Sequence, residues 1–340
     1  MRLQRQIVRG ICVGLCIPVL MLCGCQPVEG TMWTRLSIPD EWMYWTISPD
    51  LRWIAYYERE RPALGRISKE GDIQEVARID VPFSEAKFSP DSTKILLMNG
   101  RRGELWVADV PEVGRKRLVY QDTTVYEMEW SPDSRWIAVV GADFRTRVVD
   151  LEGRVQSGVV PAAPYGKIRY LPFSWSPDGS RLVYTVEGPR TVWVMDIASG
   201  GQYMLTTLPS PPLGWRVIPC WSPSGMYIAL VGGTTEGQEG VAIIDSWGKH
   251  ILSVEMPVMN RWHCYWSPDG KNLAIETRQK NEAGGERDAL GVLTMPEGTM
   301  RYYLTVGSGA LKGWSPDSTA VIIKPLMEDM LVRLPLRSGD

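Results

Sequence analysis

Histidine and phenylalanine are scarce in this chain of 340 residues, which contains 2 His and 4 Phe. With only His250 and His263, the chain cannot build a metal centre from several imidazoles. The Gly-x-Ser-x-Gly pattern of a hydrolase nucleophile is also missing. The formal net charge of −2 gives no positive field for nucleic acid phosphates. We therefore expect a protein that is not an enzyme, uses no cofactor and has no nucleic acid partner.

The first 24 residues have the pattern of an export signal. Three arginines lie within the first nine residues, and the uncharged apolar run 11–22 is short for a membrane span. Residues 22–25, Leu-Cys-Gly-Cys, resemble the bacterial lipobox. That resemblance implies cleavage before Cys25 and a diacylglycerol on the Cys25 thiol. An uncleaved signal anchor is the alternative.

This interpretation divides the chain into a signal peptide (1–24), a lipidated cysteine with a short tether (25–31) and a folded domain (32–340). It predicts an exported protein anchored to the bacterial membrane through its lipid. The location would be the periplasmic face of the outer membrane in a cell with two membranes, and the cell surface otherwise. A Cys25→Ser variant should move to the soluble fraction, whereas retention in the membrane would indicate a signal anchor.

Two cysteines, Cys220 and Cys264, remain in the folded domain, which is too few for a disulfide framework. Each precedes a Trp-Ser-Pro motif, at offsets that differ by one residue. Neighbouring side chains of a strand face opposite ways, so we expect two buried free thiols. A Cys220–Cys264 disulfide is the alternative.

A short turn motif recurs seven times along the chain. An aromatic residue or Ile precedes Ser-Pro, and Asp usually follows. Pro fixes φ in a tight turn, and Ser or Asp binds nearby backbone amides. The motif prolines lie 41 to 48 residues apart, the spacing of propeller blades. They are Pro49, Pro90, Pro132, Pro177, Pro223, Pro268 and Pro316.

These repeats predict an all-β, seven-bladed β-propeller with four-stranded antiparallel blades. The last repeat lacks a fourth strand, so residues 32–38 are expected to close it as an N-terminal outer strand. Deleting these residues should sharply lower the thermal midpoint. The motif aromatic residues are expected to fill the wedges between blades, which would account for much of the excess of 15 Trp.

The repeats resemble the TolB-like, or WD-like PD-type, propeller family, whose pattern is aromatic-Ser-Pro-Asp-Gly followed by an apolar strand. The likeness covers nearly the whole mature chain and implies the propeller fold. The TolB propeller has six blades and a separate N-terminal domain. This chain has seven repeats and no room for that domain, so a role in the Tol system does not carry over.

Candidate binding residues precede the motifs, where loops enter the innermost strands. Acidic residues fall on blades one to three and arginines on blades four to six, with aromatic residues on both arcs. Aromatic residues and Arg are enriched at binding hot spots. Three longer loops, 58–63, 232–240 and 278–288, are expected on the same side, the last of them mobile. The candidates are Glu41, Trp42, Tyr44, Glu85, Tyr126, Glu127, Arg169, Tyr170, Trp215, Arg216, Arg261, Trp262 and His263.

Two functions fit this pattern. The first is a membrane-tethered module that recruits a protein or peptide partner. The second is a glycan- or small-molecule-binding protein at the channel mouth, where Trp42, Trp215 and Trp262 would stack on sugars. A weak hydrolase with a cation held by Glu85 and Glu127, as in lactonase-type propellers, is a variant of the second.

Overall fold

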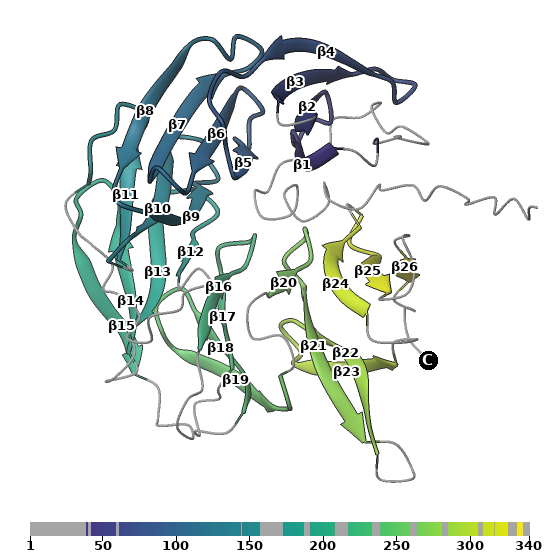
Figure 1. Ribbon diagram of the computed structural model, residues 1–340. Helices are drawn as coiled ribbons and strands as arrows, with labels where there is room; N and C mark the ends of the chain where they lie inside the picture. The colour runs from purple at the N-terminus through teal and green to yellow at the C-terminus, as the bar shows by residue number, and fades with distance from the viewer. Residues whose placement is uncertain are drawn as a thin grey trace, which may run out of the picture.

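The computed structural model describes residues 39, 42–58, 61–143, 145–156, 173–186, 191–207, 217–232, 239–258, 264–280, 285–304, 309–315, 317–325 and 332–335. In this part of the chain, seven antiparallel sheets stand around a central axis as the blades of a propeller (Figure 1). The predicted all-β, seven-bladed fold is confirmed. No helix within these ranges is long and apolar enough to cross a membrane.

Each blade follows the chain from an innermost to an outermost strand. Blade 1 contains β1 (Trp42–Ile47), β2 (Trp53–Glu58), β3 (Arg61–Ile67) and β4 (Ile73–Arg78). Blade 2 contains β5 (Glu85–Phe88), β6 (Lys94–Asn99), β7 (Glu104–Asp109) and β8 (Lys116–Gln121). Blade 3 contains β9 (Val125–Trp130), β10 (Trp136–Gly141) and β11 (Thr146–Asp150). Blade 4 contains β12 (Phe173–Trp175), β13 (Arg181–Val186), β14 (Thr191–Asp196) and β15 (Gln202–Thr207).

The remaining blades continue the same order. Blade 5 contains β16 (Ile218–Trp221), β17 (Tyr227–Val231), β18 (Gly240–Asp245) and β19 (His250–Glu255). Blade 6 contains β20 (Tyr265–Trp266), β21 (Asn272–Lys280), β22 (Glu286–Thr294) and β23 (Thr299–Leu304). Blade 7 contains β24 (Gly309–Trp314), β25 (Ala320–Pro325) and β26 (Val332–Pro335).

Blades 3 and 7 show three strands each within the described ranges. In blade 3, Val155 forms a bridge with Val149 of β11 where a fourth strand would begin. In blade 7, the predicted outer strand 32–38 lies outside the described residues, as do the signal peptide and Cys25. Closure of the ring by that segment therefore stays a prediction.

The second strand of a blade is buried along most of its length. After the first residue, β6 and β10 are buried at every position, because neighbouring blades pack on both of their faces. This explains why the apolar run after each turn motif reads as continuous rather than alternating. The outermost strands β4, β8, β15 and β19 are exposed or half-buried along most of their length, because no further strand covers their outer edge.

Motif tryptophans link neighbouring blades as well as filling the space between them. The indole Nε1 of Trp130 donates to the carbonyl oxygen of Lys87 at 3.0 Å, across blades 3 and 2. Trp266 donates in the same way to Cys220, and Trp314 to Tyr265. Each acceptor directly precedes the motif aromatic residue of the preceding blade. The predicted wedge role of these aromatic side chains is confirmed for these blades, and each indole faces the blade before it in the chain.

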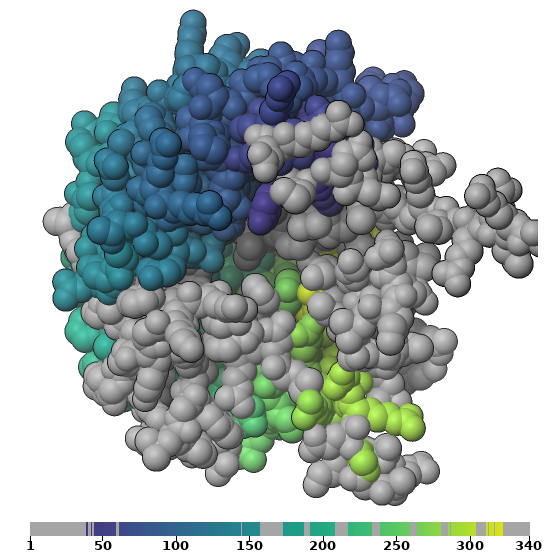
Figure 2. Space-filling view, in the orientation of Figure 1, coloured from purple at the N-terminus to yellow at the C-terminus, as the bar shows by residue number. Residues whose placement is uncertain are grey.

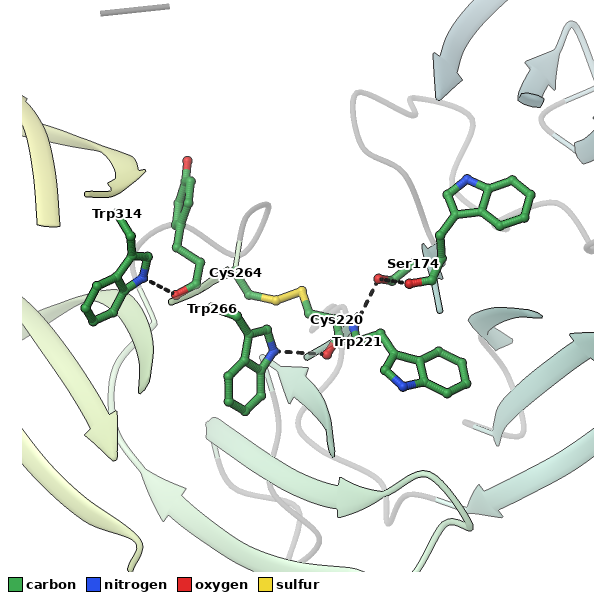
Figure 3. Close-up of a disulfide and its surroundings, with 8 residues drawn as sticks. Ser174, Cys220, Trp221, Cys264, Trp266 and Trp314 are labelled. Atoms are coloured by element: carbon green, nitrogen blue, oxygen red, sulfur yellow. Dashed lines mark hydrogen bonds between the residues drawn. A yellow bond between two sulfur atoms is a disulfide. The ribbon is translucent and has the colours of Figure 1, made fainter. Parts of the chain in front are cut away.

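Cys220 and Cys264 form a disulfide between blades 5 and 6, so the expectation of two free thiols is wrong (Figure 3). Their Cα atoms lie 6.3 Å apart, within the usual range for a disulfide. Trp221 packs toward blade 4, so Cys220, one residue earlier, faces blade 6. Trp266 faces blade 5, and Cys264, two residues earlier, faces the same way. The one-residue difference in offset therefore brings the thiols together.

Two of the expected loops are largely strand. Glu58 and the segment 61–63 belong to β2 and β3, and Glu58 pairs with Arg61. In blade 6, β21 and β22 continue in register to Lys280 and Glu286, which makes a long projecting hairpin where a mobile loop was expected (Figure 1). Cross-strand pairs of opposite charge such as Arg278 and Asp288 support this extension. The third expected loop, 232–240, lies mostly outside the described residues.

Candidate binding face

The strand order gives the propeller two distinct faces. The Ser-Pro turns and the turns between third and fourth strands share one face, which we call the turn face. The loops that enter the innermost strands, and the turns between second and third strands, share the other, which we call the loop face. Figure 2 shows blades 1 to 3 as one continuous coloured surface.

Two tyrosines are the extra residues of β-bulges in innermost strands. The β1 register steps from Met43 to Trp45 past Tyr44, and the β9 register steps from Val125 to Glu127 past Tyr126. Tyr44 has a φ of +54°, a costly conformation for a bulky side chain. The two side chains are 63% and 41% exposed. Because a bulge re-aims side chains, both rings project at the loop-face ends of their strands.

Aromatic packing supports Tyr44 from below. Its ring meets that of Tyr57 edge-on, with centroids 6.4 Å apart, and Tyr57 meets Phe83 of the next blade edge-on at 4.6 Å. The neighbouring Trp42 stacks face to face on Tyr56, with centroids 3.5 Å apart. One face of the Trp42 ring is therefore already covered, while Tyr44 is the more exposed ring.

Lys87 of β5 holds a cluster of carboxylates from two blades. Its Nζ lies 3.4 Å from Glu85, 3.1 Å from Glu127 and 3.0 Å from Glu129, and it donates to the carbonyl oxygen of Met128 at 2.9 Å. All of these residues belong to the innermost strands β5 and β9. The structure thus brings the predicted Glu85 and Glu127 together, with Lys87 between them.

Burial and charge both act on this cluster. Burial raises the pKa of Glu85 above its usual value, although Lys87 opposes this. Burial would lower the pKa of Lys87, but Glu129, Glu127 and Glu85 outweigh it and hold that pKa well above the usual value. The ammonium therefore supplies the cation at the place where a metal ion between Glu85 and Glu127 was considered. No group of metal-binding side chains is found among the described residues.

A second polar cluster lies on the loop face where blades 2 and 3 meet. Arg147 donates to both oxygens of Asp143, at 2.8 and 2.7 Å, and these bonds lower the pKa of Asp143 to about 2. The Tyr120 hydroxyl donates to Asp122 at 3.1 Å, and burial raises the Tyr120 pKa to about 12. A Cβ at Gly141 would lie 2.6 Å from Asp122 Oδ2 and from the Tyr120 hydroxyl, so a larger residue there would displace the ends of these two side chains.

The structure describes one arc of the predicted site. Trp42, Tyr44, Glu85, Tyr126 and Glu127 lie on the loop-face ends of blades 1 to 3. Sequence reasoning missed Lys87 and Glu129, although alternation along β5 and β9 places them beside the predicted glutamates. The remaining candidates are outside the described residues: Glu41, Arg169, Tyr170, Trp215, Arg216, Arg261, Trp262 and His263.

The fold and this face define a propeller whose innermost strands display aromatic and charged side chains at one end. The chain is 31% identical, over 121 residues, to a protein described as a putative Tricorn-like protease C-terminal subunit of Sulfurisphaera tokodaii. The match covers 35% of this chain and 14% of that relative, so this chain spans only a small part of the length of the relative. No family model matches the sequence.

Proposed function

We propose that this protein is an exported, lipid-anchored propeller of the TolB-like type that recruits a protein or peptide partner through its loop face. The observation that carries the proposal is the pair of bulges that project Tyr44 and Tyr126. Such bulges occur next to functional sites, where they direct a side chain outward.

The energetics of Tyr44 favour a binding role over a packing role. A tyrosine in the left-handed region costs stability, and most of this ring remains in water. The edge-on contact with Tyr57 offsets part of that cost, and the exposed remainder of the ring is available to a partner, since tyrosine is a frequent anchor at protein interfaces. The neighbouring cluster of three glutamates and Lys87 adds charged groups that a polar rim would use.

The stacking of Trp42 on Tyr56 bears on the glycan alternative. A sugar-binding platform requires an open aromatic face, and this stack covers one face of the ring. The exposed tyrosines, which come from separate blades, fit the spread-out contacts of a protein or peptide better than the convergent contacts of a small ligand.

Crosslinking and affinity capture from native membranes test this proposal. We expect the wild type to capture a partner that a Tyr44→Asn, Tyr126→Ser variant loses, because Asn tolerates the left-handed conformation and keeps the fold. Tyr302→Ser is the matched control, since Tyr302 is similarly exposed but lies on the outer strand β23. Equal capture by the loop-face variant and the control would contradict the assignment of this site.

A further inference from the structure

Large apolar side chains gather on blades 4 and 5, away from the candidate binding face. Trp247 is 79% exposed, Met226 57% and Met204 51%, and Tyr203 and Ile251 are also exposed. All five lie at the turn-face ends of their strands or in turn-face turns. Single exposed apolar residues are ordinary, but a group of this kind marks an interaction surface.

Backbone contacts bring the segments that carry these side chains together, and we call the surface they form the apolar patch. The backbone N–H of Ser246 donates to the carbonyl oxygen of Met226, which ties the Trp247 turn to the Ser-Pro turn of blade 5. On the other side, a Cβ at Gly248 would meet the backbone of Leu205, the residue after Met204. The patch therefore crosses from blade 5 to the outer strand of blade 4.

The protein backbone holds Trp247 outward. The backbone N–H groups of Trp247 and Lys249 both donate to Asp245 Oδ1 at 2.9 Å, and Gly248 takes a φ of +88°. These bonds fix the backbone of the turn, and the Trp247 side chain is exposed on it. The exposure of Trp247 is thus a property of the turn itself.

Addition of a partner strand to the blade edges does not explain the patch. The outer strands β15 and β19 each contain a bulge, at Leu205 and Ile251, which interrupts the row of backbone groups that a partner strand would need. The patch offers side chains rather than an edge. Trp, Tyr and aliphatic side chains with a nearby lysine are the composition found at membrane interfaces.

The length of the N-terminal segment allows this face to reach a bilayer. Fourteen positions separate Cys25 from Pro39, the first described residue, and an extended chain of that length spans about 46 Å. A blade strand of six residues is only about 20 Å deep. The segment is therefore long enough to pass from the start of β1, on the loop face, to the turn face. The predicted outer strand 32–38 would cover that distance, since outermost strands run from the turn face to the loop face, and would leave the tether 25–31 at the turn face.

We propose that the apolar patch rests on the lipid bilayer that holds the anchor, so that the turn face of blades 4 and 5 meets the membrane. The inference rests on the lipid anchor of the proposed function. In this orientation the loop face, with Tyr44 and Tyr126, points away from the bilayer and toward a partner. The indole of Trp247 enters the headgroup region, and Lys249 stays at its polar edge.

Tryptophan quenching in vesicles tests the proposal with the full lipid-anchored protein. The protein is reconstituted into phosphatidylcholine vesicles whose acyl chains are brominated near the headgroup, and its emission is compared with that in unbrominated vesicles. We expect bromine-dependent quenching of the wild type and a clear loss of that quenching in Trp247→Phe. Trp42→Phe, on the loop face, is the control and should keep the wild-type quenching.

Equal quenching of the wild type and Trp247→Phe would overturn the proposal, as would the absence of quenching or failure of the purified protein to enter vesicles. A patch covered by a second copy would appear as dimers in detergent and unquenched Trp247, which also overturns it. Failure of the binding function would instead appear in the Tyr44 and Tyr126 capture, and failure of the anchor in the Cys25→Ser fractionation.

Discussion

Lys87 occupies an environment unlike that of a surface lysine, because three carboxylates share its ammonium group. Two strands from different blades supply these carboxylates, so the cluster joins blades 2 and 3 at the innermost edge of the sheets. Its side chain is largely buried, and the screening by water that weakens surface ion pairs is reduced there. Removing the Lys87 ammonium should therefore lower the free energy of unfolding more than removing the charge of an exposed lysine.

Replacing Lys87 with Met should lower the free energy of unfolding at pH 7 by about 2 kcal/mol, because three glutamates lose their shared cation. Burial already raises the pKa of Glu85, and protonating this carboxylate removes part of the repulsion, so acidification toward pH 5 should shrink the difference from the wild type. Urea unfolding across this pH range measures both effects. Lys116→Met is the control, since its partner Asp80 is mostly exposed; an equal loss in both variants would contradict the role of the cluster.

Buried tyrosines predict the alkaline limit of stability. Burial raises the pKa values of Tyr120 and Tyr184 to about 12 from their usual 10.0. A folded-state pKa above the unfolded value means stability that is complete below pH 10 and is lost as the pH rises toward 12. Urea unfolding between pH 8 and 11.5, with absorbance titration of the phenols, should show this fall. A Tyr120→Phe, Tyr184→Phe variant should depend less on pH, and an unchanged dependence would refute the assignment.

The Ser-Pro-Asp turn is the element that sets the geometry of each blade. In blade 3, Ser131 Oγ donates to Asp133 and accepts from the backbone N–H of Trp136, which opens the next strand. Five other blades repeat the Ser–Asp bond, with donors Ser48, Ser89, Ser176, Ser267 and Ser315. The expectation that Ser or Asp of the motif binds nearby backbone amides is confirmed in these six blades.

Blade 5 departs from this element, since Ser222 meets Ser224 at 3.0 Å where the others meet Asp. Replacing Ser224 with Asp should restore a charge-assisted bond and raise the free energy of unfolding by about 1 kcal/mol. The midpoint of thermal unfolding measures the change. Ser224→Ala should lower that midpoint; an Asp variant no more stable than Ala would show that the carboxylate contributes nothing there.

At the scale of the whole molecule, stability depends on how the blades are joined. Apolar clusters lie between successive blades from 1 to 7, and the Trp indole bonds and the Lys87 cluster add polar links across three of these interfaces. The Cys220–Cys264 disulfide is the covalent link among the described residues. It closes a long loop of chain, with the two cysteines 44 positions apart.

Reduction of this disulfide should lower the free energy of unfolding by up to about 4 kcal/mol, the chain-entropy estimate for a loop of this length. Thermal unfolding with and without dithiothreitol measures the loss. A Cys220→Ser, Cys264→Ser variant should resemble the reduced protein and should not respond to the reductant. An identical midpoint for oxidised and reduced wild type would contradict a stabilising role.

The number of blades, their order and most strand positions follow from the sequence alone, because a Ser-Pro turn and the apolar run after it are local features. Position before the turn motif also predicted that Glu85 and Glu127 lie in the first half of innermost strands, which is where β5 and β9 contain them. Contacts between blades depend on whether each side chain faces the preceding or the following blade, and the motif sequence does not determine which of the two it faces. Cys220 lies one residue before its motif Trp and Cys264 lies two residues before. The two side chains face each other because Trp221 and Trp266 both face the preceding blade, and the sequence does not give that direction.

The positions of the β-bulges also could not be predicted from the sequence. Tyr44 is the extra residue in β1 and Tyr126 the extra residue in β9, so neither side chain points in the direction that strand alternation predicts. The sequence by itself determined the propeller, because its information lies within each repeat. Only the tertiary structure decided the disulfide, the Lys87 cluster, the two projecting tyrosines and the apolar patch, because each depends on backbone register or on contacts between separate turns and blades.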